Sequence, residues 1–141
     1  MNRYFIFVLC LFLAGCSTKP VFTSKPDNAH VRIAKSEIDG YTPFRATLKR
    51  TTFGSYPFIV EKEGYEPLFG RLPLNVRPGI IVLDALLFAP MVFWNAQSGF
   101  KFYEFDLHSG LIRFRNSPKD EWETFVIPEQ EKALGKAYFG K

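Results

Sequence analysis

The sequence predicts a mainly β fold: a small antiparallel β-sandwich, then an apolar helical or hairpin segment, a β-hairpin and a short C-terminal helix. Several short stretches alternate apolar and polar residues, as strands with one buried face do. Turn-forming Gly, Pro, Asn and Asp residues lie between these stretches. Hydrophobic residues make up 47% of the 141-residue chain, including 16 Phe, so the composition provides a core and excludes general disorder.

Residues 1–15 have the pattern of a secretory signal peptide. Arg3 supplies the positive charge, residues 4–13 form an apolar core, and Ala14 and Gly15 are the small residues expected near a cleavage site. A helix through that core would rise about 15 Å, half of the hydrocarbon thickness of a bilayer. We therefore expect this leader to be removed and not to span the membrane.

The leader ends in Leu13-Ala14-Gly15-Cys16, which resembles the lipobox of bacterial lipoproteins. The resemblance implies cleavage after Gly15, a diacylglycerol thioether on Cys16 and an amide-linked acyl chain, such as palmitate, on the new amino terminus. No other cofactor and no metal is expected, and both cysteines lie in the first 16 residues, which excludes a disulfide framework in the rest of the chain. In the lipoprotein sorting rule, Asp directly after the lipidated cysteine indicates retention in the inner membrane. This chain has Ser17 at that position, which implies the periplasmic face of the outer membrane. The inner membrane and the cell surface are the alternatives.

Residues 16–20 are expected to form the lipidated N-terminus and a short tether. The four residues 17–20 reach at most about 14 Å when fully extended. The sequence therefore predicts a domain that is held close to the bilayer surface.

Residues 21–75 carry the alternation expected of a small β-domain. Pro57 indicates an edge strand or the start of a strand, whereas Gly70 and Pro73 weaken the last strand. The predicted strands cover residues 30–34, 44–50, 55–64 and 66–74. Before the first of them, Pro26 and Asn28 favour a tight reversal.

This part of the chain resembles the PEGA domain family. The family has a Pro-Glu-Gly-Ala turn, then a Gly-x-Thr-Pro motif and a Gly-Tyr motif. Residues 21–74 contain the corresponding segments in that order: Pro26-Asp27-Asn28-Ala29, Gly40-Tyr41-Thr42-Pro43 and Gly64-Tyr65. Asp27 and Asn28 replace the Glu and Gly of the naming motif, and both keep turn propensity. Two further reversals are expected at Gly40 and Gly64. The resemblance implies a β-module for structure and interaction, without established catalytic residues.

Residues 76–99 form an apolar segment whose role the sequence leaves open. Residues 80–94 contain one charged side chain, Asp84, and are too short to span a bilayer comfortably. The segment is either part of the core, with Arg77 as a partner for Asp84, or a lipid contact, or a surface for a partner or for self-association. The possible contact residues are Ile80, Leu83, Leu87, Phe88, Phe93 and Trp94.

Residues 100–141 predict a β-hairpin and a helix. Strands are expected at 100–107 and 111–115, around a turn at His108, Ser109 and Gly110. Residues 117–122 are expected to be a loop. A helix is expected over 128–138, because Pro128 suits its first position and Glu129 its first turn.

The sequence indicates no catalytic site. The two histidines, His30 and His108, are expected at the surface, and Glu61 with Glu63 is expected to be a solvated pair of charges. The net charge of +4 is scattered along the chain, which excludes a nucleic-acid footprint and indicates either a solvated surface or a weak attraction to anionic lipid headgroups. We therefore expect a non-catalytic, membrane-anchored structural or interaction lipoprotein that binds an envelope protein, a glycan or itself. The alternative is a membrane-active accessory in envelope assembly or transport that uses residues 80–94.

Overall fold

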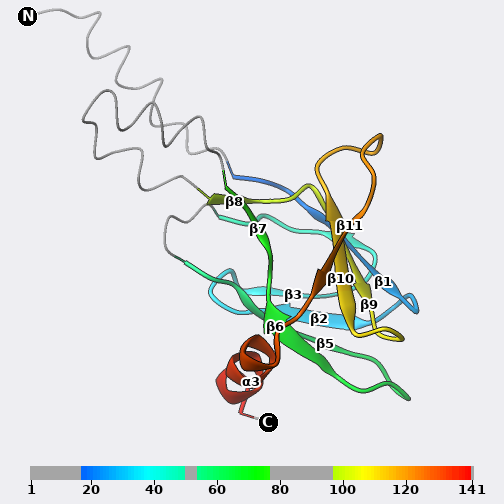
Figure 1. Ribbon diagram of the computed structural model, residues 1–141, viewed down its shortest axis with the longest axis vertical. Coiled ribbons are helices and arrows are strands. Elements are labelled where there is room, and N and C mark those ends of the chain that lie inside the picture. Colours follow the sequence, from blue (N-terminus) through cyan, green and yellow to red (C-terminus); the bar gives the residue numbers. More distant parts are fainter. Residues whose placement is uncertain (1–16, 50–53, 77–96, 141) are drawn as a thin grey trace, which may run out of the picture.

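The computed structural model describes residues 17–49, 54–76 and 97–140. Two β-sheets and a short two-stranded ribbon make up most of this part of the chain, and one helix lies at the end opposite the ribbon (Figure 1). The prediction of a mainly β fold with a short C-terminal helix is therefore confirmed.

The larger sheet contains strands from both ends of the chain. Its order is β11 (Glu123–Val126), β10 (Leu111–Arg115), β9 (Phe102–Asp106), β1 (Val21–Lys25) and β4 (Phe44–Arg45). Strands β9 and β10 form the predicted hairpin, although β9 begins later than expected. Strand β11 was not predicted. Strand β1 runs parallel to β9, a pairing that the sequence did not predict, whereas the described strand pairs within residues 21–75 are all antiparallel, as expected.

The smaller sheet is antiparallel throughout. Its order is β3 (Ile38–Tyr41), β2 (His30–Ile33), β5 (Pro57–Glu61) and β6 (Leu68–Arg71). Strand β5 is central, and Pro57 is its first residue, as the strand-start interpretation requires. The ribbon pairs β7 (Leu74–Val76) with β8 (Gln97–Gly99).

The core lies between the two sheets and is rich in aromatic rings. Phe22 of β1 stacks on Tyr103 of β9 at 5.4 Å between ring centroids. Phe58 of β5 meets Phe105 of β9 at 5.1 Å, which joins the smaller sheet to the larger one. All four side chains are buried. Aromatic pairs at these distances contribute about 0.5–1.5 kcal/mol each beyond the burial of their area.

The pairing crosses the division that the sequence indicated at residue 75. Strand β1 pairs with β9 over five residues but with β4 over only two. The later part of the chain therefore satisfies most of the backbone of β1, which a domain of residues 21–75 alone would leave open. Among the described residues, the two predicted units share one core.

Two of the three predicted glycine and asparagine turns are confirmed. Asn28 has φ of 60° between β1 and β2, and Gly64 has φ of 82° between β5 and β6. Gly40 instead lies inside β3. The reversal before β3 uses Lys35 and Glu37 in the left-handed region, with φ of 65° and 53°, and neither residue type signals such a conformation.

Residues 17–20 are built into the fold. The amide of Thr18 donates to the Leu48 carbonyl at 3.3 Å, and the Leu48 amide donates back at 2.9 Å. Pro20 is fully buried and accepts a hydrogen bond from Ala46. Strand β4 is shorter than the expected strand 44–50. Beyond Arg45, the backbone of Ala46 and Leu48 is hydrogen-bonded to residues 18–20, which lead into β1. The expected linker is correspondingly shorter than 17–20.

Helix α3 (Glu129–Tyr138) packs on β6 (Figure 1). Pro128 is its N-cap and not its first residue. Glu131 accepts a 2.7 Å ion-pair contact from Arg71 of β6. Gly135 is buried, and its backbone lies directly on that of Gly70.

Candidate functional site

The residues that the sequence singled out for lipid attachment and lipid contact lie outside the described residues. They are Gly15, Cys16, Ile80, Leu83, Leu87, Phe88, Phe93 and Trp94. Their roles stay predictions. In the described ranges, none of the helical structure is long and apolar enough to cross a bilayer.

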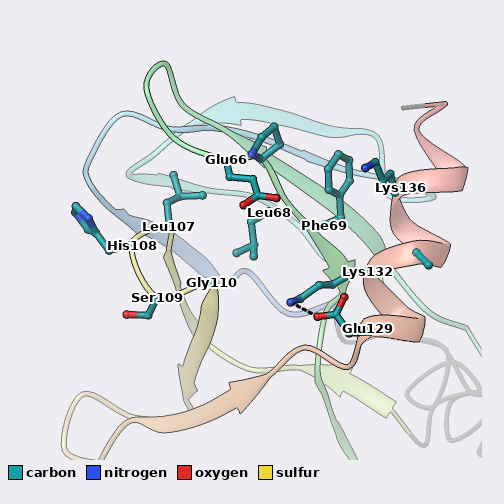
Figure 2. Close-up of a pocket in the computed structure, with 12 residues that line it drawn as sticks. Glu66, Leu68, Phe69, Leu107, His108, Ser109, Gly110, Glu129, Lys132 and Lys136 are labelled. Atoms are coloured by element: carbon teal, nitrogen blue, oxygen red, sulfur yellow. Dashed lines mark hydrogen bonds and ion pairs between the residues drawn. The ribbon is translucent and has the colours of Figure 1, made fainter.

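A groove of about 660 Å³ lies between α3, strand β6 and the turn that joins β9 to β10 (Figure 2). Leu68 and Leu107 are buried in it, and Phe69 is half-buried, so its floor is apolar. A concave apolar surface with a few polar groups around it is the usual form of a binding site.

The rim of the groove carries charges of both signs. Glu66 and Glu129 supply carboxylates, and Lys132 and Lys136 supply ammonium groups. The Lys132 Nζ donates to Glu129 Oε1 at 2.7 Å, as the dashed line in Figure 2 marks. Exposed pairs of this kind contribute at most about 1 kcal/mol, and they exchange easily for a partner's charges. The rim therefore suits a segment that has apolar and charged groups together.

The third wall of the groove is a turn fixed by Asp106. Its Oδ1 accepts hydrogen bonds from the His108 and Ser109 amides at 3.0 and 3.1 Å, and its Oδ2 accepts from Arg113 at 2.9 Å and from the Ser109 hydroxyl at 3.1 Å. Burial by itself raises the pKa of Asp106, but these bonds, first that of the Ser109 amide and then that of Arg113, hold the pKa below its ordinary value.

The polar groups of this turn hold its shape and do not form a nucleophile with a base. The Ser109 hydroxyl donates to a carboxylate whose pKa is lowered, which makes Asp106 a weak proton acceptor. The His108 ring packs edge-on against Tyr65 with centroids 4.9 Å apart. Within the described ranges, no cluster of three or more His, Cys, Asp or Glu has the spacing for a metal ion. The arrangement is suited to binding.

The other candidate side chains lie elsewhere. His30 of β2 stacks on Tyr41 at 4.8 Å between centroids, and its Nε2 contacts Asp39. Glu61 pairs with Arg32 at 2.9 Å, and it lines a second hollow together with His30 and Glu63. The structure brings none of these residues into the groove.

No family model, curated protein or solved structure matches this chain.

Two of the segments that carry the PEGA resemblance contact each other. The Thr42 hydroxyl accepts a hydrogen bond from the Ala29 amide at 3.0 Å and lies 2.5 Å from the Ser24 hydroxyl. Ser24 in turn donates to the Pro26 carbonyl at 2.7 Å. The Thr-Pro segment thus fixes the turn between β1 and β2. The family resemblance itself stays a prediction.

Sequence reasoning missed the groove because it treated the helix and the strands separately. Lys132 and Lys136 are four residues apart and therefore lie on one side of the predicted helix. This spacing could have indicated a basic face of the helix. The strand on which the helix packs could not be predicted, because the contact between α3 and β6 depends on two glycines far apart in the chain.

Proposed function

We propose that this protein is a membrane-anchored interaction lipoprotein of the bacterial envelope. Lipid on Cys16 would hold it on the periplasmic face of the outer membrane. The groove beside α3 would bind a segment of an envelope protein, and the protein would perform no catalysis. This function also allows a glycan or a second copy of the chain as the partner.

The observation that carries this proposal is the position of Thr18. Thr18 is hydrogen-bonded to Leu48, and it follows Cys16 by two residues. Two extended residues span about 7 Å. A lipid on Cys16 would therefore hold the folded body directly against the bilayer, with almost no slack.

The groove lies at the other end of the folded body. Gly99 of β8 approaches Thr18, since a Cβ at residue 99 would come 3.3 Å from the Thr18 hydroxyl. The β7–β8 ribbon therefore marks the anchor end, and α3 lies at the opposite end (Figure 1). A body anchored in this way would present its groove away from the membrane, toward a partner in the periplasm.

Photo-crosslinking in intact cells tests this function. A photoreactive residue at Lys136, which is exposed and lines the groove, should give discrete protein adducts. The same residue at exposed Lys35, between β2 and β3, is the matched control and should give none. Cys16→Ser should remove the adducts, because the protein would leave the membrane. Identical adducts from both positions, or adducts that survive Cys16→Ser, would contradict the proposal.

The ribbon also favours a second candidate function, a membrane-active accessory. Val76 and Gln97, which flank residues 77–96, pair with each other at the anchor end, and Val76 is 47% exposed. The apolar residues 80–94 would then contact the same bilayer as the lipid. Deleting residues 80–94 separates the two interpretations. Retained folding with lost vesicle binding supports lipid contact, whereas unfolding shows that the segment belongs to the core.

A further inference from the structure

Three exposed basic side chains gather at the anchor end of the larger sheet. Lys19, Arg45 and Lys101 line a hollow of about 300 Å³, together with Ser17 and Thr18. We call these three side chains the basic cluster.

The pairing around Val21 brings the basic cluster together. Val21 is the first residue of β1, and its Cα partners are Arg45 of β4 and Phe102 of β9. The Val21 amide donates to the Lys101 carbonyl at 2.9 Å. Lys19 precedes Val21 by two residues in the same extended segment. Segments from three distant parts of the chain therefore meet at one hollow.

Within the part of the chain that the structure describes, the cations of the basic cluster have no acidic partner. Across residues 17–49, 54–76 and 97–140, no ion pair within 4.0 Å involves Lys19, Arg45 or Lys101. Nearby on the same sheet, Lys25 and Arg113 are both paired with Glu104, at 3.3 and 3.4 Å. Carboxylates thus accompany the neighbouring cations but not the cluster.

We propose that the basic cluster binds the phosphate group of an anionic lipid headgroup. A hollow lined by two lysines and an arginine suits a phosphate, which accepts several charge-assisted hydrogen bonds. The hollow includes Ser17, the residue after Cys16. This inference rests on the proposed lipid anchor, because the anchor is what brings the hollow to the bilayer surface.

The cluster would act as a second membrane signal beside the acyl chains. A polybasic patch combined with a lipid chain is a common way to make anchoring stable. Each cation near an anionic surface contributes about fivefold in membrane affinity at physiological ionic strength. The attraction extends only about 8–10 Å from the surface and weakens as salt is added. It would also fix the orientation of the body, with α3 pointing away.

Lysine footprinting on the lipidated protein tests the proposal. The full protein is reconstituted in vesicles of phosphatidylcholine alone, or of phosphatidylcholine and phosphatidylglycerol in equal parts, and treated with a water-soluble acetylating reagent. Lys19 and Lys101 should be acetylated about fivefold more slowly in the anionic vesicles, and high salt should remove the difference. Lys35 and Lys136, both exposed, are the internal controls and should not change. Equal acetylation of Lys19 in both kinds of vesicle overturns the proposal.

A charge-matched pair of variants separates the hollow from a general charge effect. Arg45→Gln combined with Lys101→Gln should remove the protection of Lys19. Lys35→Gln combined with Lys119→Gln changes the net charge equally at exposed positions outside the hollow and should leave the protection intact. All four positions are exposed, so the variants should stay folded, and circular dichroism checks this. Equal effects of the two variants contradict a specific site.

Two further outcomes identify the source of the phosphate and the state of the anchor. Inorganic phosphate that protects Lys19 equally well on phosphatidylcholine vesicles would overturn a lipid headgroup as the ligand. The mass of the N-terminal fragment in the same digest shows whether Cys16 is lipidated. If it is not, the proposed anchor fails, and the cluster is then tested by sedimentation of the protein with the same two vesicles. Binding to the anionic vesicles alone supports the cluster, and binding to neither overturns it.

Discussion

Gly135 of α3 rests on Gly70 of β6, and neither position has room for a side chain. A Cβ on Gly135 would lie 2.9 Å from the Gly70 amide nitrogen, and a Cβ on Gly70 would lie 2.9 Å from a methyl carbon of Ile127. Strand β6 is therefore held between Ile127 on its core face and α3 on the other. This contact sets the wall of the groove, because it determines how closely α3 approaches β6.

Gly135→Ala should lower the stability of the fold. In an isolated helix the change would stabilise by about 1 kcal/mol, since Ala is the better helix former. Here the methyl group would push α3 off Gly70, and overpacking of this kind costs about 1–3 kcal/mol. Urea unfolding measures the net effect. Ala137→Gly, at an exposed helical position, is the control and should cost only about 1 kcal/mol from propensity. A stabilised Gly135→Ala protein would show that the contact is loose.

Thr42→Val should destabilise the turn between β1 and β2. Thr42 is buried, and Val keeps its shape but loses the hydroxyl that accepts from the Ala29 amide. Leaving a buried donor without a partner costs about 1–3 kcal/mol. Thermal unfolding should show a lower midpoint for Thr42→Val and a smaller change for Thr42→Ser, which keeps the hydroxyl. Equal loss in both variants would mean that the methyl group matters and the hydroxyl does not.

Asp106 should make stability depend on pH in acid. Its pKa in the folded protein lies below the ordinary value of 3.8, so the folded state binds the proton less readily than the unfolded chain. Its contribution is therefore complete above about pH 4 and is lost as the pH falls through the lower, folded-state pKa. Asp106→Asn should cost about 1–3 kcal/mol at neutral pH and flatten the acid dependence. Urea midpoints across the acid range test this, and an Asn variant with the same acid dependence as the parent would refute it.

Gly99→Ala should loosen the N-terminal segment. A Cβ at Gly99 would come 2.5 Å from a methyl carbon of Leu48, which is fully buried and bonded to Thr18. Leu48 would have to move, and the Thr18 pairing would weaken with it. Hydrogen exchange at the Thr18 and Leu48 amides should accelerate several-fold more than exchange at Ile112, a core residue of β10. Uniform acceleration would indicate a global loss of stability without local release.

Local patterns in the sequence predicted the helix and strands β2, β4, β5, β6, β9 and β10, but not β1, β3 or β11, and not the way the strands combine. The alternation of Val31 and Ile33 and the turn at Asn28 are local, and the structure confirms both. The parallel pairing of β1 with β9 joins residues about eighty positions apart, and no local pattern encodes such a pair. The same reason explains why the meeting of Gly70 and Gly135 was missed.

The sequence predicts only part of the candidate sites. Gly is a poor helix former, yet the missing side chain of Gly135 is what lets α3 dock on β6. The basic cluster was counted among scattered charges, because Lys19, Arg45 and Lys101 come from three separate segments. Tertiary structure brings them together, whereas the lipid attachment predicted at Cys16 depends on local sequence alone.

Mass analysis of the N-terminal fragment of the protein extracted from membranes tests the central claim most directly. The account predicts a chain that begins at Cys16 and carries a diacylglycerol thioether and an amide-linked acyl chain. A chain that retains residues 1–15, or one that begins elsewhere with unmodified Cys16, would contradict it.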